Sequence, residues 1–213
     1  MLHCVYYHVE PSEFEYVDKY FTKTLPYFQI WVTPNSIINR ISGCNFDLIS
    51  EQHDYFITLE KDVSFYDNTF VYNSNDNEQY ALPIKIQYNS GQSSFLTIRN
   101  CTFTQATRKS HSSGANVFYC SNTYSINVDF QSCLFDDCGI SAAEKIIQIE
   151  SQNSFIKMDD CTFQFTNPTA VQPLYSVCSN AVINNCRFIE TGLFEIDQTN
   201  NDDSTPITSN SIS

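Results

Sequence analysis

Leu96-Thr-Ile-Arg-Asn-Cys-Thr-Phe103 is one of six copies of an eight-residue pattern, in which apolar residues take the first and third positions, Cys or Asn the sixth and Phe the eighth. The other copies begin at Asn39, Val63, Val128, Ile156 and Ala181, and only Asn39 departs from the apolar first position. Successive copies lie 24 to 33 residues apart. A unit that recurs at such an interval is typical of a solenoid, in which each repeat packs on its neighbours.

The pattern predicts a strand, a bend and a second short strand. Alternation over the first three positions suits a strand with one buried face, and the Cys-x-Phe end resumes that alternation. The two residues between are mostly Asn, Asp, Ser or Gly, as in Asn184-Asn185, and these residue types tolerate a tight bend or a left-handed backbone. We therefore expect one internal stack of phenylalanines, formed by Phe46, Phe70, Phe103, Phe135, Phe163 and Phe188.

A further apolar run follows each copy of the pattern. These runs cover residues 56–59, 84–87, 117–120, 146–149, 175–178 and 193–196. Each period therefore holds about three short strands and no convincing helix. A chain that returns to the same register after each set of strands forms a parallel β-coil, and the stacked coils bury one continuous core.

Asn100-Cys-Thr-Phe103 and Asp160-Cys-Thr-Phe163 carry a resemblance to a known family. Over residues 37–198, the chain resembles a right-handed parallel β-helix of the pectin-lyase-like superfamily, with repeats similar to those of polymorphic outer membrane proteins. The glycine pairs that usually follow the phenylalanine in that family are missing, apart from a remnant at Ser113-Gly-Ala115. The resemblance implies an all-β, right-handed parallel β-helix of about six coils, one for each copy of the pattern, and an extracellular or cell-surface location.

The two ends of the chain differ from the repeats. Residues 1–36 are expected to form an N-terminal cap or a degenerate extra coil. Ser12-Glu-Phe-Glu15 is a capping-box pattern, and Phe14, Val17 and Phe21 follow at helical spacing, so the cap interpretation predicts a short helix at about 12–21. Residues 199–213 are polar and are expected to be a disordered tail.

The charge and hydropathy of the chain limit its partners. A formal net charge of −13, from 24 acidic and 11 basic residues, opposes contact with nucleic acid or anionic lipid. No apolar run approaches the roughly 18 residues that a membrane-spanning helix needs. The start of the chain lacks the pattern of a signal peptide. We therefore expect a protein that stays inside the cell or a part of a longer exported chain.

Nine cysteines are present, and five of them occupy the sixth position of the pattern: Cys44, Cys101, Cys133, Cys161 and Cys186. We favour a ladder of small buried thiols, because free cysteine is among the most buried residue types. Disulfides between adjacent coils are the alternative, since stacked Cα atoms fall near the separation that a disulfide needs. Asn68 replaces Cys in the second copy and would interrupt that column. The cysteine spacing does not match a zinc site, and we expect no cofactor or metal.

Asp129, Lys157 and Asp159 form the strongest constellation of candidate catalytic residues. They occupy outward positions on neighbouring coils, where, with Asp160 nearby, they could bind a cation or position an acid and a base. The alternative is a solvated charged surface with an ion pair between Asp129 and Lys157. The histidines fall outside these outward positions; they are His3, His8, His53 and His111.

These observations favour a non-catalytic structural or adhesive β-helix segment of a surface or secreted repeat protein, which binds a protein or a glycan along its sheet surface. Tyrosines would anchor such a ligand, and the tyrosines expected at outward or loop positions are Tyr66, Tyr72, Tyr88 and Tyr124. The resemblance implies an alternative, a carbohydrate-active enzyme that acts as a polysaccharide lyase or hydrolase. An intracellular repeat scaffold is the third hypothesis. Asn100-Cys-Thr102 is the only N-glycosylation sequon, and its place at a predicted tight bend argues against its use.

Overall fold

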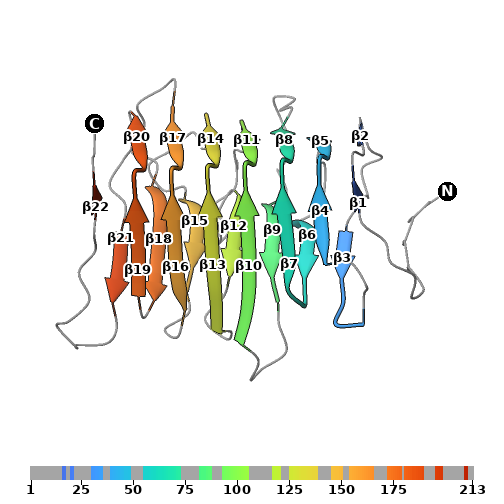
Figure 1. The fold of residues 1–213 in the computed structure, drawn as a ribbon, viewed down its shortest axis with the longest axis horizontal. Helices are drawn as coiled ribbons and strands as arrows, with labels where there is room; N and C mark the ends of the chain where they lie inside the picture. The colour runs from blue at the N-terminus through green and yellow to red at the C-terminus, as the bar shows by residue number, and fades with distance from the viewer. Residues whose placement is uncertain are drawn as a thin grey trace.

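Three parallel sheets, here named A, B and C, are built from strands that alternate along the chain (Figure 1). The computed structural model describes residues 16–17, 20–21, 30–35, 39–48, 55–72, 82–87, 93–105, 117–120, 125–138, 145–150, 154–165, 172–178, 180–189, 195–198 and 209–210. These residues form strands, bends and turns, and no helix occurs among them. The predicted all-β parallel solenoid is therefore confirmed.

Each sheet takes every third strand of the chain. Sheet A consists of β1 (Tyr16–Val17), β4 (Arg40–Ser42), β7 (Val63–Tyr66), β10 (Ser93–Arg99), β13 (Ser125–Gln131), β16 (Phe155–Asp159), β19 (Asn180–Asn184) and β22 (Ser209–Asn210). Sheet B consists of β2 (Tyr20–Phe21), β5 (Asn45–Leu48), β8 (Thr69–Tyr72), β11 (Thr102–Thr104), β14 (Leu134–Asp136), β17 (Thr162–Gln164) and β20 (Arg187–Ile189). Sheet C consists of β3 (Ile30–Val32), β6 (Tyr55–Leu59), β9 (Leu82–Ile86), β12 (Phe118–Cys120), β15 (Lys145–Ile149), β18 (Gln172–Cys178) and β21 (Glu195–Gln198).

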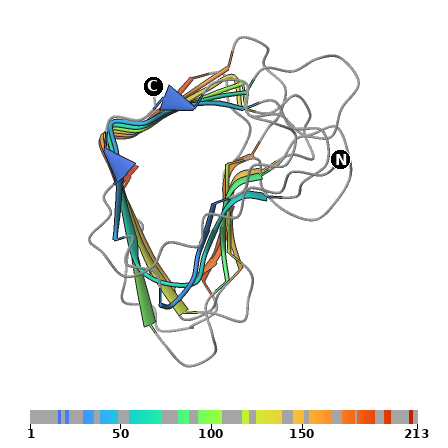
Figure 2. The same ribbon diagram turned by 90° about the vertical axis from the view of Figure 1, so that its right-hand side faces the viewer.

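The eight-residue pattern accounts for two of the three sheets. The first half of each copy forms a strand of sheet A, and the Cys-x-Phe half leads into a strand of sheet B. The apolar runs between the copies form sheet C, as predicted. Seen along the solenoid axis, the strands superimpose as three walls (Figure 2). Buried apolar side chains from all three sheets form one continuous cluster inside them.

The N-terminal residues extend the sheets. The helix predicted at about 12–21 is wrong at the four of these residues that the structure describes, because Tyr16–Val17 and Tyr20–Phe21 are strands that pair with β4 and β5. The choice between a cap and a degenerate coil stays a prediction, because most of residues 1–36 lie outside the described part of the chain. The rest of the predicted helix lies outside the described residues.

The polar C-terminal segment also contributes a strand. Within residues 199–213, Ser209–Asn210 form β22, which pairs with Ile183–Asn184 of β19. The other residues of this segment lie outside the described part of the chain, so disorder there stays a prediction.

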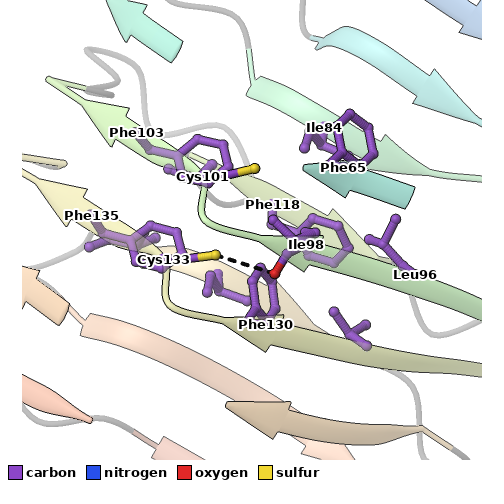
Figure 3. Packing of buried hydrophobic residues seen from close by; sticks show 14 of the residues in the cluster. Phe65, Ile84, Leu96, Ile98, Cys101, Phe103, Phe118, Phe130, Cys133 and Phe135 are labelled. Carbon is purple, nitrogen blue, oxygen red and sulfur yellow. Dashed lines mark hydrogen bonds between the residues drawn. The ribbon is translucent and has the colours of Figure 1, made fainter. Parts of the chain in front are cut away.

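The six phenylalanines of the pattern form the predicted internal stack. They are paired in register along sheet B, with centroids of neighbouring rings 4.4 to 5.2 Å apart and planes within 13° of parallel. Figure 3 shows Phe103 above Phe135, beside the sheet A residues Ile98 and Phe130. This stack fills the interior along the axis, because parallel sheets place equivalent residues about 4.8 Å apart.

A left-handed residue produces the bend between sheets A and B. The residue before the sixth position of the pattern has φ between 51° and 64° in all six copies: Gly43, Asp67, Asn100, Ser132, Asp160 and Asn185. In the first five copies its backbone N–H donates to a carbonyl of the next coil, as from Asn100 to Gln131 at 2.9 Å. The Asn, Asp, Ser and Gly residues at this position are therefore explained by their tolerance of positive φ.

The cysteines of the pattern are buried thiols that form no disulfide. Cys133 Sγ donates to Ile98 O of the preceding coil at 3.3 Å (Figure 3), and Cys186 Sγ lies 3.7 Å from the equivalent carbonyl of Met158. Cys120 and Cys138, outside the pattern, are also buried and form no disulfide. The predicted ladder of buried thiols is confirmed for the five cysteines of the pattern, and the disulfide alternative is wrong for them.

Candidate functional site

The outer face of sheet A carries the candidate residues. Strand alternation buries Val128 and Phe130 and turns the residues between them outward. Parallel pairing then aligns equivalent outward residues of successive coils. One column contains Thr97, Asp129, Lys157 and Val182, and the neighbouring column contains Arg99, Gln131, Asp159 and Asn184.

These two columns form one connected network of charges. Arg99 Nη2 lies 3.2 Å from Asp129 Oδ2, and Lys157 Nζ lies 3.9 Å from Asp129 Oδ1. Lys157 also bonds to Asp159 of its own strand. The other carboxylate oxygen of Asp159 accepts a hydrogen bond from Asn184 Nδ2 at 2.8 Å. The charges of two cationic and two anionic side chains therefore cancel across three coils. Asn184 extends the network to a fourth coil.

The network shifts the pKa values of its members in opposite directions. The hydrogen bond from Lys157 to Asp159 raises the pKa of the Lys157 ammonium above its ordinary value. Burial acts to raise the pKa of Asp159, but the hydrogen bonds from Lys157 and Asn184 outweigh it, so the pKa of this carboxyl lies below its ordinary value. Both groups are therefore held in their charged forms.

The structure brings together all three residues predicted from the sequence. Asp129 and Lys157 pair across two coils as the ion-pair interpretation expected, and Lys157 also binds Asp159. Asp160, the fourth carboxylate considered, is exposed at the bend and has positive φ. Arg99 was missed as a partner, although its place in the adjacent outward column is readable from the sequence.

The described residues offer little other chemistry. No group of three or more His, Cys, Asp or Glu side chains among them is arranged to hold a metal ion. The histidines considered above all lie outside the described residues. Within the same described part of the chain, no helix is long and apolar enough to cross a membrane.

Two aromatic side chains on the outer face of sheet A have different surroundings. Phe95 of β10 is 61% exposed, which makes it the one large apolar side chain that is exposed among the described residues. Its backbone N–H donates to Asp62 Oδ1 at 2.9 Å. Tyr66 is half-buried, with the Arg40 guanidinium 4.9 Å from its ring centroid. Phe95, which the sequence analysis did not single out, is therefore the better placed aromatic anchor.

The other tyrosines predicted as anchors lie wholly or partly outside the described residues. Tyr72 ends β8, but its side chain lies outside the described part of the structure. Tyr88 and Tyr124 also lie outside the described residues. Their contribution to a binding surface stays a prediction.

Comparison of the chain with protein-family models, with curated proteins and with solved structures finds no match. The parallel solenoid therefore rests on the strand pairing and burial described above.

Proposed function

We propose that the chain is a non-catalytic structural or adhesive segment of a surface or secreted repeat protein, and that it binds a glycan or a protein along the outer face of sheet A. We further infer from the resembling repeats that it belongs with the right-handed β-helices of the pectin-lyase-like superfamily. The surface location rests on the same resemblance.

The neutralised charge network is the observation that supports a non-catalytic role most strongly. A general acid or base works best when its pKa lies near the working pH. Asp159 has a lowered pKa and Lys157 a raised one, which is the opposite of the tuning found in acid–base pairs. The ionised groups also bind one another, so the network is suited to joining the coils.

The surroundings of Phe95 support a binding role for this face. An exposed phenyl ring offers a ligand apolar area at a small cost in side-chain entropy. The neighbouring outward residues Thr97 and Asn127 are polar and uncharged, and Phe155 follows Asn127 in the same column. A polar surface that surrounds an exposed aromatic side chain is typical of a binding patch.

A binding measurement tests this proposal. The full chain is applied to immobilised neutral polysaccharides, acidic polysaccharides and extracellular-matrix proteins, and bound protein is quantified. For a ligand that binds, we expect Phe95→Ser to weaken binding about tenfold or more, equivalent to about 1.4 kcal/mol. Leu134→Ser, on the outer face of sheet B, is the matched control and should leave binding unchanged. Equal binding by both variants and the original chain would place the site elsewhere.

The enzyme alternative is tested separately. The full chain is incubated with the same polysaccharides in the presence of calcium, and new reducing ends and unsaturated products are measured. We expect no products. Products that disappear in Asp129→Asn or Asp159→Asn, but persist in Asp160→Asn, would establish catalysis and overturn the proposed role.

A further inference from the structure

The sequon Asn100-Cys-Thr102 lies at the corner where sheet A turns into sheet B. Asn100 follows β10, has φ of 52° and is exposed, and Thr102 opens β11 and is half-buried. Cys101 between them is buried. Because the asparagine and the hydroxyl residue of a sequon carry the chemistry, a buried middle residue does not conflict with modification, provided that it is not proline.

The backbone and the side chain of Asn100 have separate roles. The backbone N–H donates to Gln131 O at 2.9 Å and joins this coil to the next. The side-chain Nδ2 donates to Asp67 Oδ1 at 3.0 Å, and both of these side chains are exposed. An asparagine amide carries two N–H groups. A substituent on Nδ2 would not disturb the backbone hydrogen bond to Gln131. It would replace one of the two N–H groups, and the other could still donate to Asp67.

The neighbouring corners leave room for a large substituent. The equivalent residues of the adjacent coils are Asp67 and Ser132, which are exposed and have short side chains. The tight bend that argued against modification in the sequence therefore places Asn100 on an open ridge of the solenoid.

We propose that Asn100 is an N-glycosylation site. This inference rests on the proposed surface or secreted location, because the modification requires entry into a secretory pathway. The co-substrate is an oligosaccharide attached to a lipid diphosphate. Asn100 Nδ2 attacks the anomeric carbon of the first sugar and loses one proton as the new C–N bond forms. The C–O bond to the diphosphate breaks, and the lipid diphosphate leaves.

The other coils supply matched positions for a test. Asp160 occupies the equivalent bend, with φ of 56°, and is followed by Cys161 and Thr162, so Asp160→Asn creates a sequon with the same geometry. Asn185, with φ of 51°, is followed by Cys186 and an exposed Arg187, so Arg187→Thr creates another. Both added sequons should be modified if this corner accepts a glycan.

The full chain is produced behind a cleavable signal peptide in ER-derived microsomes, and occupancy is read from intact mass before and after treatment with a peptide N-glycosidase. We expect one glycan on the original chain, none on Asn100→Gln or Thr102→Ala, and one on Thr102→Ser. Asp160→Asn and Arg187→Thr should each add a second glycan. An original chain that carries no glycan overturns the proposal, whether or not the added sequons are used.

Secreted material from eukaryotic cells tests whether the fold accommodates the glycan. The melting temperatures of the glycosylated chain and of the enzymatically deglycosylated chain should agree. A clearly lower melting temperature of the glycosylated chain would contradict the placement of Asn100 on an open ridge. Ligand binding by bacterially produced, unglycosylated chain is measured separately. Failure of glycosylation alone therefore leaves the proposed adhesive function standing, and failure of binding alone leaves the sequon assignment standing.

Discussion

The side-chain oxygen of Asn68 accepts the backbone N–H of Cys44 at 3.0 Å, across one turn of the solenoid. Its Nδ2 donates to Ile41 O of the preceding coil at 2.9 Å. The Cys133 thiol donates to the equivalent carbonyl of its own preceding coil, that of Ile98. Asn68 is only 1% exposed. Asparagine and cysteine therefore serve a similar purpose at this position, because the Asn68 amide and the Cys133 thiol each donate a hydrogen bond to the equivalent carbonyl of the preceding coil.

Replacement of Asn68 tests this equivalence. Asn68→Ala leaves a buried N–H and a buried carbonyl without partners, and we expect it to lower the free energy of unfolding by about 1–3 kcal/mol for each group. Asn68→Cys should cost clearly less, because a thiol restores the hydrogen bond to the Ile41 carbonyl at the ladder position. Urea unfolding of the two variants under reducing conditions measures the difference. Equal destabilisation by both would show that the hydrogen bonds at this corner are unimportant.

The described thiols should resist alkylation in the folded protein. Burial raises the pKa of Cys101 to about 11 and that of Cys120 to about 12. At pH 8 the reactive thiolate is therefore scarce at both sites, and the sulfur atoms are also shielded from reagent. Labelling with iodoacetamide, followed by peptide mapping, should show both cysteines unmodified until denaturant is added. Rapid labelling of Cys101 in the native chain would contradict the buried ladder.

Replacement of a phenylalanine by alanine should lower the stability most in the middle of the stack. Phe135 is fully buried, with stacked rings 5.2 Å and 4.4 Å away on its two sides. We expect Phe135→Ala to cost about 3–5 kcal/mol, because it removes a large buried side chain and leaves a cavity. Phe188→Ala should cost less, because Phe188 is only partly buried. Melting temperatures of the two variants provide the measurement, and a larger loss for Phe188→Ala would count against the stack as the main core.

The left-handed corner residues should prefer glycine to β-branched residues. Ser132 has φ of 53°, and its exposed side chain has little packing to lose. Ser132→Val should destabilise the fold by about 1–2 kcal/mol, because steric crowding at Cβ opposes a left-handed backbone and a β-branched side chain is more crowded there than serine. Ser132→Gly should be neutral or slightly stabilising for the same reason. Chemical denaturation distinguishes them, and a neutral Ser132→Val would refute the assigned bend.

The charge network should stabilise the fold within a defined pH range. The folded-state pKa of Asp159 is lowered, so its contribution is present above the unfolded value of about 3.9 and is lost as the pH falls through the folded value. The pKa of Lys157 is raised, so its contribution is present below about 10.4 and is lost as the pH rises through its folded value.

Asp159→Asn measures this contribution. Lys157 is 41% exposed, so solvent screens the pair, and we expect a loss of about 0.2–1 kcal/mol at pH 7. The loss should shrink in high salt and disappear in acid. Asp160→Asn is the control, because it removes a charge from the adjacent exposed residue. A pH-independent loss in Asp159→Asn would assign its effect to hydrogen bonding alone.

The N-terminal segment shows where local sequence signals mislead. Phe14, Val17 and Phe21 have helical spacing, yet Tyr16–Val17 and Tyr20–Phe21 are strands. Backbone groups of these residues pair with Ile41, Ser42, Asn45 and Phe46 of the next coil. Pairing with a preformed sheet edge can override a short helical pattern, because an isolated helix of about ten residues is marginally stable.

The candidate site was predictable in its membership and in one of its ion pairs, that between Asp129 and Lys157. The pattern alone placed Asp129, Lys157 and Asp159 outward on adjacent coils. It did not reveal that Arg99 reaches diagonally to Asp129, or that Lys157 also binds Asp159 within its own strand. Long side chains reach several neighbours on a sheet surface, and their rotamers decide among these partners.

The eight-residue pattern by itself determined the strand order, the corner residues and the phenylalanine stack. These features follow from alternation and positive φ, which are local properties of each repeat. The tertiary structure alone decided the ion pairs of Arg99 with Asp129 and of Lys157 with Asp159, the hydrogen bonds of Asn68 and the choice between thiols and disulfides. Each of these depends on atoms 24 or more residues apart in the chain or on competition between rotamers, and only the stacking of the coils sets those distances.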